Sequence, residues 1–135
     1  MPGSLYDYMW ELHGSPYQRQ MTAEINKYYK PNLVIMDGIK IFVNGGPERG
    51  KEAEPNLLLA SKDRTAIDAV GVAILRSYGS TSNIMNGRIF DLPQLRRASE
   101  LEIGAKSASD IRITPVDEES RKNCDQITGI LQREG

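Results

Sequence analysis

The spacing of hydrophobic residues divides this chain into helical and extended segments. Asp63 and Asp117 each stand directly before a segment of helical period and are residue types that favour the N-cap. Gly79 and Gly104 each follow such a segment and favour helix termination. Helical spacing of apolar residues predicts helices over residues 4–13, 16–30, 64–78, 92–103 and 118–133.

Continuous apolar runs predict strands in the same chain. Residues 33–36 and 57–60 are short and uninterrupted apolar runs, which is typical of strands buried on both faces. Residues 39–43 fit either an extension of the first strand or an apolar loop. Residues 111–114 alternate between apolar and polar side chains and predict an edge strand, which Pro115 ends. Loops are expected in the polar stretches between these elements, at residues 44–50 and 80–87.

Strands and helices that alternate along a chain favour a layered α/β domain. We therefore expect a small central sheet, mostly parallel or mixed, flanked by helices. The whole chain, residues 1–135, is expected to be a single α/β domain. Within it we distinguish an aromatic-rich helical arm over residues 1–30, a core over residues 31–115 and a C-terminal helix over residues 116–135.

Composition and charge exclude several classes of protein. The chain has 135 residues, with 17 Lys and Arg against 18 Asp and Glu, so it lacks the basic excess of a nucleic-acid binder. Its one cysteine, Cys124, cannot form an intrachain disulfide or hold an iron–sulfur cluster alone. No apolar run approaches the roughly 18 residues of a membrane span, and residues 1–4 show no signal-peptide pattern. We expect a cytoplasmic protein that binds neither nucleic acid nor membrane.

Two carboxylates follow the predicted strands. Asp37 follows the first strand directly, and Asp63 comes soon after the second. If these strands are parallel neighbours, both side chains lie at the carboxyl edge of the sheet, where open α/β folds bind ligands. The pair would then bind a divalent metal or share acid–base chemistry. The structural alternative is that Asp37 starts a turn and Asp63 caps a helix.

Asp68 is the only charged residue in residues 66–75, a helical stretch that is otherwise apolar. A buried carboxylate needs a partner, and Arg64 lies one helical turn before it. A structural ion pair and a functional role are both open for Asp68. Gly71 in the same helix costs about 1 kcal/mol relative to Ala, which indicates a close backbone approach.

The glycine-rich loop and the lone histidine are further candidates. Glycines let backbone N–H groups converge on an anion, and an arginine would add a bidentate contact. The loop is otherwise a plain turn, because it matches no established phosphate-binding motif. His13 is a candidate for catalysis, with a capping or surface role as the alternative. The candidate ligand-binding residues of the loop are Asn44, Gly45, Gly46, Arg49 and Gly50.

Several motifs occur in a distinctive order along the chain. Residues 32–38 are Asn-Leu-Val-Ile-Met-Asp-Gly, and residues 44–47 are Asn-Gly-Gly-Pro. Residues 56–63 are Asn-Leu-Leu-Leu-Ala-Ser-Lys-Asp, and residues 66–71 are Ala-Ile-Asp-Ala-Val-Gly. In this order they resemble the family called domain of unknown function 362, whose members are often labelled iron–sulfur-centre proteins.

The resemblance spans roughly residues 13–114 and covers what would be the C-terminal portion of a longer member. It implies an α/β domain in which Asp37, Asp63 and Asp68 lie near one site, and it implies no established reaction. The cysteine clusters of many members are absent, so no iron–sulfur cluster is expected within this chain.

Two hypotheses about function remain open at this stage. The first is a domain that binds a divalent metal or a small anionic ligand, with or without catalysis. The second is a non-catalytic module that oligomerises or binds a partner chain. In the second hypothesis an exposed sheet edge and the aromatic residues of the first 30 positions form the contact, because aromatics are enriched at interfaces.

Overall fold

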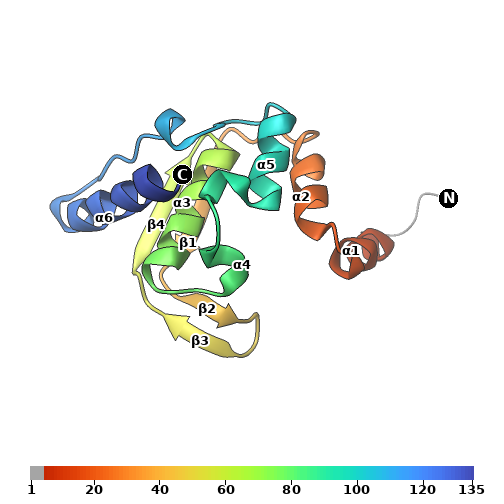
Figure 1. Cartoon of the computed structure of the whole chain (residues 1–135), viewed down its shortest axis with the longest axis horizontal. Coiled ribbons are helices and arrows are strands. Elements are labelled where there is room, and N and C mark those ends of the chain that lie inside the picture. Colours follow the sequence, from red (N-terminus) through yellow and green to blue (C-terminus); the bar gives the residue numbers. More distant parts are fainter. Residues whose placement is uncertain (1–4) are drawn as a thin grey trace.

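The strands form one long bent hairpin, and helices pack against one side of it (Figure 1). The structure is a computed structural model that describes residues 5–135, with side chains from residue 9 onward. The strands are β1 (Val34–Gly38), β2 (Ile41–Gly45), β3 (Gly50–Ala53) and β4 (Leu57–Ser61). The helices are α1 (Leu5–Gly14), α2 (Gln18–Asn26), α3 (Arg64–Ser77), α4 (Ser82–Met85), α5 (Pro93–Glu100) and α6 (Glu118–Glu134), with short 3-10 turns η1 (Ile89–Asp91) and η2 (Ala108–Asp110).

Both strand pairs are antiparallel. β1 pairs with β4 and β2 pairs with β3, so the α/β class is confirmed but the expected parallel or mixed sheet is wrong. The physical reason is the turn after β2, in which Gly46 N–H donates to the Arg49 carbonyl at 2.7 Å. Gly45 and Gly46 have φ values of 78° and 96°, which favour glycine. So tight a reversal brings the chain back beside itself, whereas parallel neighbours need a crossover of about a dozen residues or more.

The charged stretch after this turn forms β3, which the hydrophobic pattern did not predict. Lys51 and Glu52 are exposed, so no apolar period marks the strand. Across the ladder Lys40 pairs with Glu52 at 2.5 Å. Residues 39–43, ambiguous in the sequence, contribute most of β2, and Val43 is buried against the core.

Helix α3 lies at the centre of the hydrophobic core, as its apolar sequence predicts. It packs with α5, η1 and α6 in one cluster, whose most deeply buried members include Ala69, Ala73, Ile89 and Leu95. Gly71 faces β1, and a Cβ at this position would lie 3.0 Å from Met36 Sδ. The missing side chain lets the strand approach the helix, which confirms the close approach inferred from the sequence.

The β1–β4 sheet is covered on one face only. Met36 and Leu59 point toward the core, while Ile35 is 62% exposed and Leu58 is 71% exposed on the opposite face. The expectation that both strands are buried on both faces is therefore wrong. A pair of strands covered by helices on one side leaves alternate residues outside, even where the outer residues are apolar.

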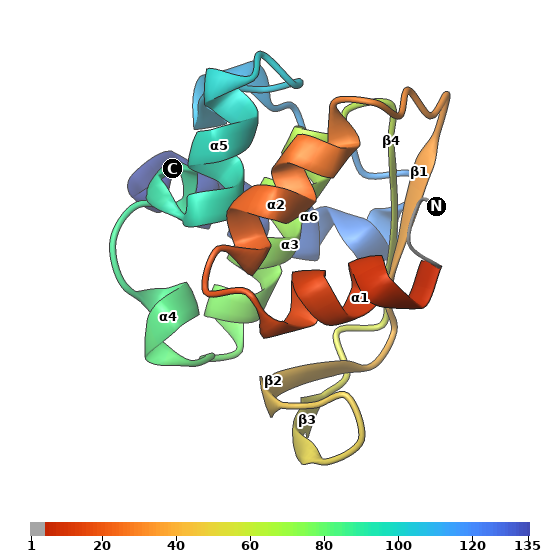
Figure 2. The same ribbon diagram turned by 90° about the vertical axis from the view of Figure 1, so that its right-hand side faces the viewer.

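The remaining helices match their predicted segments, with shorter ends in places. Asp63 and Asp117 cap α3 and α6 as expected, each accepting hydrogen bonds from the first turn of its helix. α2 ends at Asn26 and α5 at Glu100, and α4 lies in a stretch expected to be a loop. The first predicted helix includes residue 4, which lies outside the described residues. α2 packs against α5 (Figure 2), and α1 lies on the far side of α2 from the strands (Figure 1).

Residues 111–116 are extended but form no ladder with another strand of the described chain. Their side chains alternate between part-buried and exposed positions, and Ile111 and Ile113 pack against the core. The segment predicted as an edge strand is therefore extended and alternates between part-buried and exposed side chains, but it is not hydrogen-bonded to a neighbouring strand of the described chain.

Arg76 joins three parts of the fold. Its guanidinium is buried and donates to the carbonyls of Ile84 and Asn86, and it forms an ion pair with Glu134 at 2.7 Å. These contacts hold α4 and the end of α6 to α3.

The first prediction concerns this ion pair. Glu134→Gln leaves the buried Arg76 charge without a carboxylate, so the free energy of unfolding should fall by about 1–3 kcal/mol. The matched control is Glu118→Gln, whose partner Arg121 is exposed, and its cost should be about 0.5 kcal/mol. Urea denaturation of both variants measures the difference, and equal costs would contradict the structural role of Arg76.

Candidate functional site

Asp63 lies between the start of α3 and the turn that precedes η2. Its Oδ1 accepts hydrogen bonds from the N–H groups of Thr65 and Ala66, both at 2.9 Å, and its Oδ2 accepts from Ala105 N–H at 2.8 Å. Gly104 permits this contact because a Cβ there would lie 2.1 Å from Asp63 Oδ1. Gly104 also has a φ of 69°. Asp63 is therefore an N-cap that also anchors a distant segment.

Asp37 lies at the opposite end of the β1–β4 sheet from Asp63. The antiparallel register places Asp37 opposite Leu58 and places Ser61, near Asp63, opposite Val34. Asp37 Oδ1 accepts from Ile39 N–H at 2.8 Å, which is the turn role considered for it. The shared-edge argument required parallel neighbours, so the structure does not bring the two candidate metal ligands together.

Asp68 points from α3 toward α2 and α5. Burial raises the pKa of its carboxyl group, and an interaction with the Gln94 side chain and the charge of Arg19 partly oppose that shift. Gln94 Oε1 is buried and has no hydrogen-bond partner among the described residues.

Arg64 is not the partner of Asp68. Its guanidinium donates to the carbonyls of Asn26, the last residue of α2, and of Tyr29, just beyond the helix. A cation is favourable at a helix C-terminus, where unpaired carbonyls and the helix dipole are negative. Arg64 thus links α2 to the start of α3. The cation whose charge lowers the pKa of Asp68 is Arg19.

The glycine-rich loop is the turn of the β2–β3 hairpin. Gly50 is required there because a Cβ would lie 2.1 Å from the Asn44 carbonyl oxygen. The Gly46 N–H is already used within the turn. Arg49 is exposed at the tip. The turn explains the glycines, and anion binding by this loop stays a prediction.

His13 lies near the end of α1 and is exposed. Its Nδ1 is 3.2 Å from Gln18 Nε2, so the ring links α1 to the first residue of α2. His13 lies in the last turn of α1, and Figure 1 shows this helix on the far side of α2 from the β1–β4 sheet.

The structure thus distributes the candidate residues over separate places. Over the described residues, no group of three or more His, Cys, Asp or Glu side chains is arranged to hold a metal ion. No helix in residues 5–135 has the length and apolar character needed to cross a membrane.

Two surface features carry more apolar exposure than the sequence indicated. One is the outer face of the β1–β4 sheet, where the continuous apolar runs predict burial but alternate residues are exposed. The other is the helical arm, where Trp10 is 78% exposed and Tyr28 is 85% exposed. The aromatic content of the arm pointed to either a core or an interface, and the structure places these rings outside the core.

These features define an α/β domain whose small antiparallel hairpin is covered by helices on one face. A scan against known families matches residues 3–73 to the domain of unknown function (DUF362). That match covers more than half of the chain, so the protein belongs to this family. No curated protein matches it, and no solved structure matches it.

The second prediction separates the roles of the two aspartates. Asp63→Asn keeps one acceptor oxygen and loses an anchor to a backbone N–H, so the unfolding free energy should fall by about 1–3 kcal/mol. Asp37→Asn preserves the turn, because asparagine forms the same turn, and should cost about 0.5 kcal/mol or less. Chemical denaturation tests this, and a larger loss for Asp37→Asn would contradict it.

The third prediction concerns Asp68 and pH. Since burial raises the pKa of Asp68 in the folded state, folding favours its protonated form. The contribution of this group to stability is then complete below its unfolded pKa of about 4 and is lost as pH rises through the folded pKa. Asp68→Asn should therefore gain stability relative to the native protein between pH 4 and pH 7. Urea midpoints across this range measure the gain, and a constant difference would contradict it.

Proposed function

We propose that this protein is a non-catalytic module that associates with a second copy of itself through the outer face of the β1–β4 sheet. The observation that carries the proposal is the exposure of Ile35 and Leu58 on strands whose opposite face forms part of the core. Leu33 and Ile39 extend the apolar surface beyond the two ends of β1 and are also exposed.

The composition of this face favours self-association. Its β1 and β4 positions are Ile35, Asp37, Leu58 and Ala60, of which only Asp37 is charged. Contiguous apolar surface of this kind marks interaction sites on soluble domains. A two-fold arrangement places the same face on both subunits, so one apolar patch suffices for both sides of the contact.

The acidic residues give less support to a catalytic or metal-binding function. Asp63 is engaged by three backbone N–H groups, and Asp37 accepts from the turn that follows it. A carboxylate that already accepts backbone hydrogen bonds would have to give them up in order to bind a cation. The association hypothesis requires no such rearrangement.

The fourth prediction tests the outer face. The double variant Ile35→Lys/Leu58→Lys places two charges in the proposed contact, so a native dimer or larger assembly should become monomeric. The variant should still unfold cooperatively as a monomer, because both side chains point to solvent in the single chain.

The matched control is Tyr28→Lys, which also introduces a charge at an exposed apolar residue but lies on the arm. This control should keep the native mass. Light scattering coupled to size exclusion measures the three masses. A native protein that is monomeric at high concentration would overturn the proposed function.

A further inference from the structure

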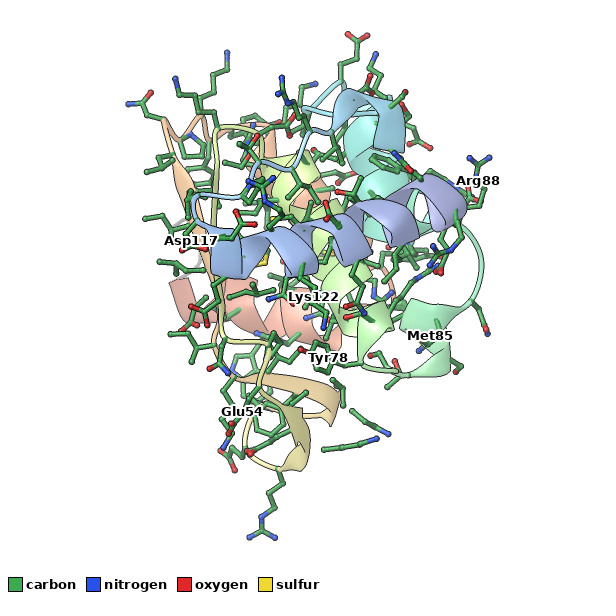
Figure 3. All side chains as sticks on the ribbon, turned by 90° about the vertical axis from the view of Figure 1, so that its left-hand side faces the viewer. Glu54, Tyr78, Met85, Arg88, Asp117 and Lys122 are labelled. Atoms are coloured by element: carbon green, nitrogen blue, oxygen red, sulfur yellow. The ribbon has the colours of Figure 1, made fainter. Side chains whose placement is uncertain are left out.

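A groove of about 570 Å³ runs along the free edge of β4. One wall is β4 itself, and the other is the extended segment over residues 111–116. Figure 3 shows this side of the molecule, with the extended chain leading into Asp117 at the start of α6 beside the strands. The floor comes from α3 and α6 and includes Ile67, Val70 and Ile127.

Both walls of the groove carry backbone groups without a strand partner. β4 is the last strand of its sheet, so the edge turned away from β1 is unpaired. Over the described residues, no backbone hydrogen bond joins β4 to residues 111–116. Ile111 has φ and ψ of −109° and 125°, which is extended geometry. An unpaired strand edge is a template for pairing with a further strand.

The side chains of both walls have the alternation that such pairing requires. Leu57 and Leu59 of β4 point toward the core, as do Ile111 and Ile113 of the opposite wall. A strand between them would place alternate side chains on the apolar floor and the others in solvent. The floor therefore selects apolar residues at every second position of the occupant.

The charged residues that line the groove indicate which side chains a bound strand would carry at the positions that point away from the floor. Of the charged residues that line the groove, Asp63 and Asp110 already accept hydrogen bonds from backbone N–H groups of this chain. Arg112 is exposed and forms no ion pair with the described residues. An acidic side chain on the occupant would complement this guanidinium.

We propose that the groove binds an extended β-strand of another polypeptide, which pairs with the free edge of β4 and presents apolar residues to the floor and acidic residues to Arg112. This mode is strand addition, in which main-chain hydrogen bonds give affinity and side-chain pockets give selectivity. It goes beyond the proposed self-association, because it adds main-chain pairing at the free edge of β4, next to the outer-face residues Ile35 and Leu58 that also line the groove.

The probe is a capped peptide of alternating composition, Thr-Val-Glu-Val-Glu-Val-Thr. Its matched control replaces both glutamates with lysines. Two readouts report on the groove: amide hydrogen exchange in β4 and in residues 111–116, and alkylation of Cys124. Because Cys124 lines the groove and is the only cysteine of the chain, its alkylation rate reports on this site alone.

The acidic peptide should slow exchange in both walls and slow alkylation of Cys124 several-fold, whereas the lysine peptide should have a weaker effect. Arg112→Glu should reverse this order of preference. The outer-face variant Leu33→Lys/Ile39→Lys, whose residues do not line the groove, should still bind the acidic peptide, which separates this inference from the proposed self-association.

Three results would overturn the proposal. The first is unchanged exchange and alkylation with either peptide at several millimolar. The second is equal binding of both peptides by the native protein and by Arg112→Glu. The third is protection of Cys124 and of residues 111–116 that appears without peptide as the protein concentration rises, which would assign this wall of the groove to a second copy of the chain.

Discussion

The fold depends above all on one carboxylate that holds together two segments far apart in the sequence. Asp63 accepts hydrogen bonds from the first turn of α3 and from Ala105, and Gly104 leaves the space for it. Thr65 adds a second link, because its hydroxyl donates to the Ile103 carbonyl. The start of α3 and the segment after α5 are thereby fixed to each other. β4 ends at Ser61, two residues before Asp63, so the end of this strand lies at the same anchor.

From this anchor the molecule is built on one side of its strands. α3 lies against the inner face of the β1–β4 sheet, with α5 and α6 packed around it, and Gly71 allows the closest approach. Helices cover that face alone, so the outer apolar face and the free edge of β4 both remain accessible. A single cause, one-sided coverage of a narrow sheet, underlies both surfaces that we propose for association.

Local signals in the sequence predicted much of this fold. Asp63, Asp117 and Gly79 act at helix ends through their own backbone neighbourhood, and the isolated Gly71 indicated a close contact correctly. Strand direction was not predictable in the same way, because it depends on a reversal at residues 46–49. The wrong strand direction affected the predicted metal site most, because Asp37 and Asp63 lie at the same sheet edge only if the strands are parallel. The exposure of one sheet face was not predictable either, because β1 and β4 are as apolar as strands that are buried on both faces.

The reversal that sets strand direction also has a practical consequence for handling the protein. The tip of the β2–β3 hairpin is exposed at Pro47, Glu48 and Arg49, and Figure 2 shows the hairpin projecting below the helices. Exposed tips with few packing contacts are where proteins best tolerate inserted sequence. An affinity handle placed there would immobilise the chain while leaving the sheet face and the groove open to solution.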